Sequence, residues 1–176
     1  TTADEPHYLL TALSLAHDGD LDVRDEFAAQ EFRPFHEIAL APQARPLADG
    51  SLIEPHDPLL PAVLALPAAA GGWVLAKLTL AAVAAALAAL LVWISVRRFA
   101  VPVVAGSAVV GVFALSPPLA SYGSQVYPEL PAALAVAAAI AALTGPLRRG
   151  GLATLAVVVV ALPWLSVKYA PVAAVL

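Results

Sequence analysis

The sequence predicts an all-α protein: a polytopic bundle of transmembrane helices with an extracytoplasmic N-terminal loop that carries an amphipathic helix. Of the 176 residues, 61% are hydrophobic and 12% are charged, and the mean hydropathy is +0.84. Soluble domains contain only about 45–50% apolar residues. The apolar residues also form several long runs, as helices that cross a bilayer require.

The charges divide the chain into two regions. Residues 1–57 hold twelve of the thirteen acidic residues and all four histidines, against three arginines, which gives a net charge of −9. Residues 58–176 hold six basic residues and one acidic residue, a net charge of +5. We therefore predict an aqueous first loop at 1–57 and a transmembrane bundle at 58–176. The chain has no cysteine, which excludes disulfides and thiolate metal sites.

The first loop is expected to begin with an amphipathic helix near residues 6–16. Thr2 and Glu5 have the spacing of a capping box, and Pro6 suits a first helical turn. Helical spacing separates apolar from polar positions, namely Leu9, Leu10, Leu13 and Ala16 from His7, Thr11, Ser14 and Asp18. We expect this helix to lie on the membrane surface, with its polar groups toward the outer cavity. Residues 21–54 are rich in turn-forming residues and are expected to be irregular.

Four spans and the start of a fifth are expected to follow. A span needs about 20 mostly apolar residues, and the candidate runs are 72–96, 100–120, 130–147, 151–167 and the partial run 171–176. Residues 55–71 are interrupted by Pro58, Pro61 and Pro67 and closed by Gly71-Gly72, and they are expected to form a short helix at the outer interface. Because the sequence contains no methionine, we expect a fragment, with a further span before Thr1 and more of the protein after Leu176.

Two arginine pairs predict the orientation of these spans. Arg97-Arg98 and Arg148-Arg149 are the only adjacent basic pairs in the chain, and short cytoplasmic loops are enriched in such residues. If both pairs face the cytoplasm, residues 1–57, 122–129 and 164–169 all face outward. The ionisable residues are therefore expected to gather on the extracytoplasmic side of the membrane.

Three groups of ionisable residues on that side each have two interpretations. Asp4-Glu5 suits helix capping or a reactive site at the mouth of the bundle, and Glu129 likewise suits a helix N-terminus or a functional site. Lys168 extends its side chain to the interface or binds an anion. Asp18, Asp20 and Asp22 imitate a calcium loop, but Val23 and Ala29 stand where its glycine and its bidentate glutamate belong. A zinc-protease helix at His36-Glu37 is excluded in the same way, since Leu40 replaces its second histidine.

Four short strings carry a resemblance to a known family. They are Asp4-Glu5-Pro6-His7-Tyr8-Leu9, Asp18-Gly19-Asp20-Leu21-Asp22, Tyr127-Pro128-Glu129 and Leu162-Pro163-Trp164-Leu165. With them the chain resembles the N-terminal half of bacterial polytopic membrane glycosyltransferases of the C-type superfamily, relatives of protein mannosyltransferases and aminoarabinose transferases. The resemblance extends over nearly the whole chain, and the acidic pair in the first outer loop is its most specific element.

The resemblance implies an enzyme integral to the bacterial plasma membrane that moves a sugar, on the extracytoplasmic face, from a polyprenyl-phosphate donor to an acceptor hydroxyl of a glycan, lipid or protein. The catalytic acid of the family falls on Asp4, with Glu5 as its partner, and a divalent cation, if one is used, would bind this pair. Attack by a hydroxyl needs a carboxylate base, and the departing phosphate needs cationic stabilisation. Lys168 or a loop arginine is expected to hold the phosphate. His7, Tyr127 and Glu129 are expected to contact substrate, together with Lys168.

Two other classes of protein fit the same sequence. In a transporter or channel segment, Glu129 and Lys168 would line a pathway, although they lie at span ends rather than at mid-membrane. A non-catalytic membrane subunit would present its outer loop to a partner. Membrane lipid is an expected partner in every case, and no nucleic acid is expected.

Overall fold

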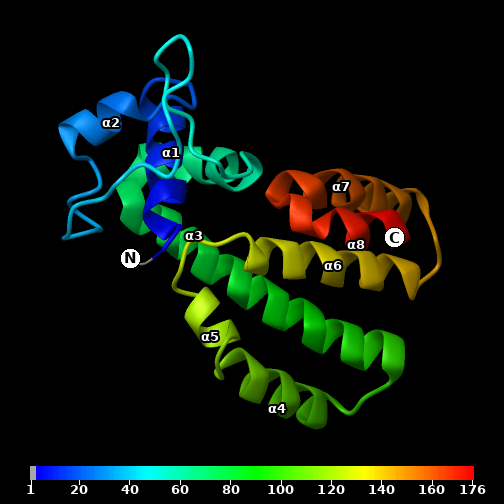
Figure 1. The fold of residues 1–176 in the computed structure, drawn as a ribbon. Coiled ribbons are helices and arrows are strands. Elements are labelled where there is room, and N and C mark those ends of the chain that lie inside the picture. The colour runs from blue at the N-terminus through cyan, green and yellow to red at the C-terminus, as the bar shows by residue number, and fades with distance from the viewer. Residues whose placement is uncertain (1–2) are drawn as a thin grey trace. The chain divides into compact units, whose positions relative to one another are not determined.

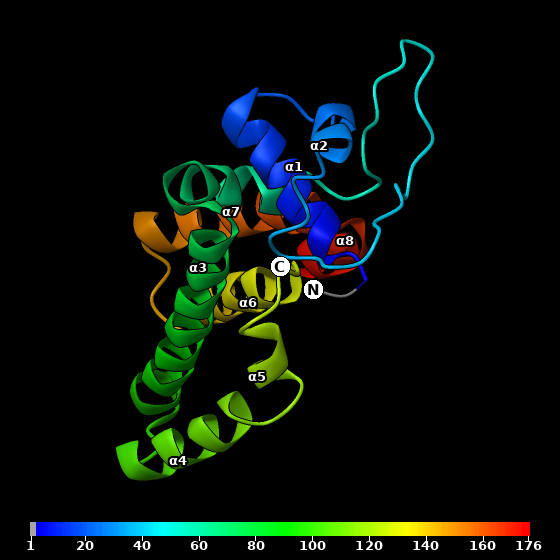
Figure 2. The ribbon, with the colours of Figure 1, turned by 90° about the vertical axis from the view of Figure 1, so that its left-hand side faces the viewer.

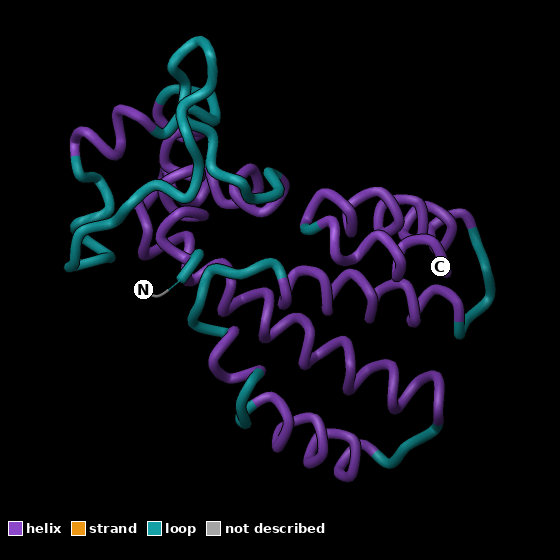
Figure 3. Tube along the Cα trace, in the orientation of Figure 1, coloured by secondary structure: helices purple, strands orange, loops and turns teal. Residues whose placement is uncertain are grey.

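The computed structural model describes residues 3–176, which are helices joined by loops (Figures 1 and 3). Within that range no strand forms, and the one β-bridge joins Asp22 to Ile53, so the prediction of an all-α protein is confirmed. Thr2 of the predicted capping box lies outside the described residues. The elements are α1 (Glu5–His17), α2 (Arg24–Ala29), α3 (Leu59–Phe99), α4 (Val103–Ala114), α5 (Leu119–Tyr122), α6 (Glu129–Leu143), α7 (Arg149–Leu165), a 3₁₀ turn (Val167–Tyr169) and α8 (Ala170–Val175).

The chain forms two compact units. The first comprises Thr1–Thr79 together with the short segment Gln125–Tyr127, and the second comprises Leu80–Ser124 and Pro128–Leu176. The first unit thus extends past residue 57 to include the beginning of α3. It also includes three residues from the loop before α6, and this loop brings Tyr127 into the same unit as the acidic pair.

Helix α1 lies inside the first unit. Its residues from Glu5 to Ser14 are all buried, including the polar residues His7, Thr11 and Ser14. The expectation of an amphipathic helix lying on the membrane with a free polar side is therefore wrong. The polar side is covered by protein from both sides of α2: Glu54 pairs with His7, and the backbone carbonyl of Asp20 accepts a hydrogen bond from the Ser14 hydroxyl.

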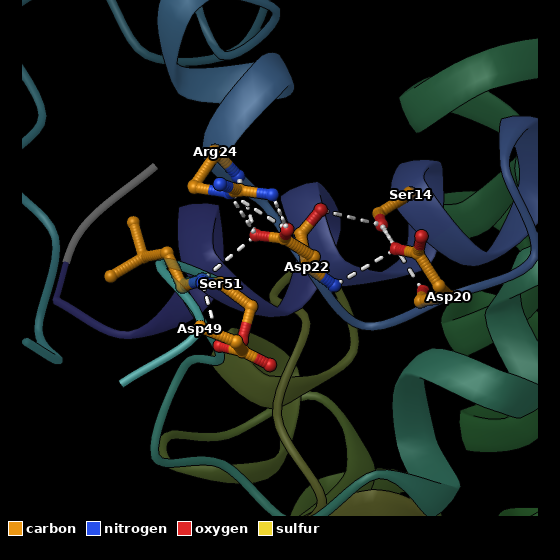
Figure 4. Close-up of polar contacts among 7 residues, drawn as sticks. Ser14, Asp20, Asp22, Arg24, Asp49 and Ser51 are labelled. Carbon is orange, nitrogen blue, oxygen red and sulfur yellow. Dashed lines mark hydrogen bonds and ion pairs between the residues drawn. The ribbon is translucent and has the colours of Figure 1, made fainter. Parts of the chain in front are cut away.

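The segment between α1 and α3 is irregular, as predicted, apart from the short α2 (Figure 3). Aspartate side chains hold it in place (Figure 4). The carboxylate of Asp22 accepts hydrogen bonds from Arg24 Nε at 2.8 Å and from the backbone N–H of Leu52 at 2.8 Å. Asp20 accepts one from the Ser14 hydroxyl at 3.2 Å, which ties the turn back to α1. These contacts act together with the buried apolar side chains of the segment, namely Val23, Phe32, Phe35 and Leu52.

Helix α3 bends sharply where two glycines meet, and Figure 2 shows the change of direction. Gly72 has φ +61° and ψ −159°, a conformation that other residues rarely adopt. The segment therefore consists of a first helix before Gly71 and a second that starts at residue 73. This agrees with the predicted short helix over 55–71 and the predicted span from residue 72. The second part is about 40 Å long at about 1.5 Å per residue, enough to cross a bilayer.

The second unit contains shorter apolar helices. Helices α6 and α7 pack side by side, and α8 packs on α7 (Figures 1 and 2). A buried cluster formed by Leu87, Ile94, Leu130 and Ala137 joins α3 to α6. Of the described helices, only α3 is long and apolar enough to cross a membrane by length and composition.

The helices of the second unit do not reach the predicted span lengths. Helix α4 has 12 residues where a span over 100–120 was expected, and it measures about 18 Å. Pro102 precedes it and Pro117-Pro118 follow it, and proline restricts helix continuation at both positions. Helices α6 and α7 have 15 and 17 residues. The number of membrane crossings thus stays a prediction.

Candidate functional site

Asp4 lies at the N-terminus of α1 with its side chain free of the capping role. Its backbone carbonyl accepts hydrogen bonds from the N–H groups of His7 and Tyr8, at 3.0 and 3.1 Å, and so starts the helix. Its carboxylate makes no capping hydrogen bond and instead accepts one from the side-chain amide of Gln43 at 2.9 Å. The side chain is partly exposed. Capping by this carboxylate, the simpler of the two interpretations, is therefore not what the structure shows.

Glu5, the neighbouring carboxylate, is in the opposite environment. It is 1% exposed. Its Oε1 lies 2.9 Å from Nζ of Lys77 and accepts a hydrogen bond from the backbone N–H of Val126 at 3.1 Å. These contacts connect α1, the second part of α3 and the 125–127 segment. Because a buried carboxylate needs such partners, Glu5 is bound to the protein itself, while Asp4 remains accessible.

A buried hydrogen-bond network of His7 and Glu54 positions Gln43, the residue that binds Asp4. Nδ1 of His7 lies 3.0 Å from Oε1 of Glu54, and both side chains are almost fully buried. An ionised carboxylate can only accept, so this contact with an ionised Glu54 requires the proton of His7 on Nδ1. Glu54 also accepts from the backbone N–H of Gln43, at 3.2 Å to Oε2. The bond to Glu54 positions Gln43, whose side-chain amide binds Asp4. His7 is therefore a buried residue that positions Glu54, and it is not exposed to a substrate.

Aromatic rings lie beside the same network. The Tyr8 and His56 rings stack with centroids 4.5 Å apart, and Tyr127 meets Tyr8 edge-on at 6.4 Å. Burial raises the pKa of Tyr127 above its ordinary value, and the negative charge of Asp4 adds to this effect. The phenol therefore stays protonated at neutral pH and can donate a hydrogen bond. Tyr127, a predicted substrate contact, is thus electrostatically close to Asp4.

A cavity of about 470 Å³ opens in the first unit where Lys77 lies. Its wall includes the aromatic rings of Phe35 and Trp73, whose centroids are 6.4 Å apart. His36, Glu37 and Ile38 complete one side of it. The cavity therefore combines a cation with flat apolar surfaces, a combination that suits an anionic ligand with a sugar or hydrocarbon part.

Glu129 and Lys168 form an ion pair in the second unit. Nζ of Lys168 lies 2.6 Å from Oε1 of Glu129, and it also lies 5.2 Å from the centroid of the Tyr169 ring. Glu129 begins α6 and Lys168 lies in the turn between α7 and α8. The pair thus links the ends of two helices, and neither residue stands at the middle of an apolar helix.

Several residues of the site were not predicted from sequence. Gln43 lies 39 positions from Asp4, Glu54 lies 47 positions from His7, and Lys77 lies 72 positions from Glu5. No spacing rule relates residues so far apart. The one available signal was Lys77 itself, the only charged residue in the apolar run 72–96.

The burial of His56 predicts a pH dependence of stability. Burial lowers the pKa of His56, and the negative charge of Asp4 offsets part of this effect. The unfolded chain then binds the proton more readily, so the free energy of unfolding should decrease as the pH falls below about 6.5. His56→Gln should remove this contribution. Thermal unfolding at pH 8 and pH 5 checks it, and an unchanged pH dependence in the variant would contradict it.

Comparison with family models, with curated proteins and with solved structures gives no match for this chain. The resemblance to C-type glycosyltransferases therefore stays a prediction from the short strings that carry it. The geometry of the site is the remaining basis for a function.

Proposed function

We propose that the chain is part of a membrane glycosyltransferase that uses a polyprenyl-phosphate sugar on the extracytoplasmic face, with Asp4 as general base. The observation that carries this proposal is the contrast between two adjacent carboxylates. Asp4 is accessible and held by a single amide, whereas Glu5 is buried and bound to Lys77. An accessible, oriented carboxylate is what the removal of a hydroxyl proton requires.

The proposed reaction is a substitution at the anomeric carbon. The acceptor oxygen forms a bond to this carbon while the bond from the carbon to the phosphate oxygen breaks. The bonding electrons leave with the phosphate, and the acceptor proton passes to the Asp4 carboxylate. The hydrogen bond from Gln43 fixes the direction of Asp4, and such positioning contributes to the rate because the base need not be reoriented.

Lys77 is better placed than Lys168 to hold the phosphate. It belongs to the same compact unit as Asp4 and lines the 470 Å³ cavity, and its ammonium has three donors, of which Glu5 receives one. We propose that the leaving phosphate binds Lys77 and that Trp73 and Phe35 contact the sugar or the first isoprene unit. This replaces our expectation for Lys168, whose ammonium is paired with Glu129.

The exposed apolar surface supports a membrane location. In the most apolar stretch of α3, 17% of the residues are buried, whereas a core helix of a soluble protein would be mostly buried. Large apolar side chains on the other helices are also open, among them Val104, Phe113, Val157, Val160 and Trp164. Lipid is the solvent that favours such a surface.

In the second unit, Arg98 lies at the C-terminal end of α6, and the Glu129–Lys168 ion pair lies at its N-terminal end. Arg98 donates a hydrogen bond to the carbonyl of Ala141 near the end of α6, at 3.1 Å, and stacks on Trp93. Glu129 stands at the other end of α6, with Lys168. The two ends are separated by a helix of about 22 Å. This supports the orientation in which the arginine pairs face the cytoplasm.

An enzyme assay tests the proposed function. Membranes that contain the protein should transfer radiolabelled sugar from polyprenyl-phosphate donors to an acceptor, and the product should be absent from matched membranes without it. Failure with a panel of hexose and pentose donors would remove the proposal. A transporter is less well supported, because the ionisable side chains of the described apolar helices lie near helix ends or, for Lys77, close to the glycine break of α3.

Single cysteines test the orientation, because the chain has none of its own. Cysteine at Ala48 or Ser124, both exposed positions, should react with a membrane-impermeant maleimide in intact cells. Cysteine at Gly150, which is also exposed, should react only after the cells are permeabilised. The reverse pattern would place Asp4 on the cytoplasmic side and would contradict the proposal.

A further inference from the structure

A second cluster of carboxylates lies where α1 ends and α2 begins. Asp18, Asp25 and Glu26 each offer an oxygen, and these atoms all lie within 4.8 Å of one another. Among the described residues this is the only group of three or more possible metal ligands that meets so closely. It belongs entirely to the first unit and contains neither Asp4 nor Glu5.

Glu26 differs from an ordinary surface carboxylate, because its side chain is buried. It is 2% exposed, and neither of its carboxylate oxygens has a hydrogen-bond partner among the described residues. A buried carboxylate without a partner is unfavourable by several kcal/mol, on the order of the figures for unpaired buried charges. Burial accordingly raises the pKa of Glu26 to about 8. A bound cation would supply the missing partner.

The neighbouring aspartates differ in this respect. Asp20 and Asp22, within the same turn, have their carboxylates occupied by Ser14, Arg24 and backbone N–H groups (Figure 4). No lysine, arginine or histidine of the described chain forms an ion pair with Asp18, Asp25 or Glu26. Among the described residues, Asp20 and Asp22 thus have protein donors, whereas Asp18, Asp25 and Glu26 lie together without a cationic partner.

We propose that Asp18, Asp25 and Glu26 bind a calcium ion that fastens the end of α1 to the start of α2. The ligands are oxygens only, which favours a hard cation. Calcium holds oxygens at about 2.3–2.6 Å, so ligands on opposite sides of the ion lie up to about 5 Å apart, in keeping with the observed spacing. Magnesium, at about 2.0–2.1 Å, requires closer and more regular ligands. The inference does not depend on the proposed function.

The test uses the purified chain in detergent, treated with chelator and then titrated with CaCl₂ by calorimetry. One calcium ion per chain should bind, with a dissociation constant of about 10⁻⁴–10⁻³ M or below, as in extracellular calcium modules. Asp18→Asn/Asp25→Asn, which changes two exposed residues, should weaken binding at least tenfold. Glu37→Gln removes one exposed carboxylate elsewhere in the unit and should bind as the wild type does.

Thermal unfolding of Glu26→Gln gives a second readout: the difference in unfolding temperature between this variant and the wild type should change sign when calcium is added. In chelator at pH 9, above the pKa of Glu26, this variant should unfold at a higher temperature than the wild type, because it removes a buried charge. In millimolar calcium the order should reverse, because only the wild type gains stability from the ion. A wild type that binds no calcium, a triad variant that binds it equally well, or tighter binding of magnesium than of calcium would overturn the proposal.

Discussion

Asp4→Asn should lower the rate of sugar transfer by at least about a hundredfold. General bases contribute about 10²–10⁴-fold to the rates of enzymes, and the amide of asparagine cannot accept the acceptor proton. The substitution keeps the size of the side chain and one oxygen that can accept from Gln43, so the protein should fold and insert normally. The measurement is transfer of labelled sugar by the full-length protein in membranes, at saturating donor.

The split between turnover and binding identifies a base. Because Asp4 makes its proposed contribution to proton transfer, kcat should fall while KM for the donor changes little. Glu31→Gln is the matched control, since it removes one carboxylate from the same unit, where Glu31 faces His17 at 3.7 Å. The control should transfer at the wild-type rate. If Asp4→Asn also does so, the base is another residue.

Asp4 illustrates what the sequence could and could not show about the site. The acidic pair could be identified as a candidate, because its position before an amphipathic pattern and its charged surroundings are local features. The sequence could not show which member of the pair is accessible and which is buried. This difference depends on Gln43 and Lys77, which reach the pair through the fold, and adjacent carboxylates in a sequence are chemically identical until the fold separates them.

Helix α1 shows the same limit for the fold. Its helical spacing of polar and apolar residues was predicted and its bounds were nearly correct. Its polar side was expected to face a cavity, yet His7 and Ser14 are buried. The hydrogen bonds that make this burial possible come from Glu54 and from the 20–22 turn, and sequence spacing within one helix carries no information about such remote partners.

The glycine pair in α3 was a better guide than hydropathy in the second unit. Gly71-Gly72 predicted a break because glycine, unlike other residues, readily adopts a non-helical conformation such as that of Gly72, and this is a property of the residue itself. Apolar runs predicted spans that α4, with 12 residues, does not fill. Hydropathy indicates that a segment avoids water, but the prolines at its ends determine how much of it is helical.

The ion pair between Glu5 and Lys77 should dominate the stability of the first unit. Lys77→Met leaves the Glu5 carboxylate buried with the N–H of Val126 as its remaining partner. Removing one partner of a buried pair typically costs about 3–5 kcal/mol. Since the Lys77 side chain is 27% exposed, we expect about 2–4 kcal/mol less free energy of unfolding. Denaturant titration of the chain in detergent micelles, followed by circular dichroism, measures it.

A double-mutant cycle distinguishes this ion pair from simple packing. Glu5→Gln should cost less than Lys77→Met, because the partly exposed ammonium of Lys77 can turn toward solvent whereas the Glu5 carboxylate cannot. The double variant Glu5→Gln/Lys77→Met should therefore be more stable than Lys77→Met alone, since it removes the uncompensated buried charge. Lys77→Arg, which keeps the charge, should lie between Lys77→Met and the wild type. If adding Glu5→Gln makes Lys77→Met less stable instead, the carboxylate is not the source of the cost, and the contact between α1 and α3 rests on packing of the lysine stem.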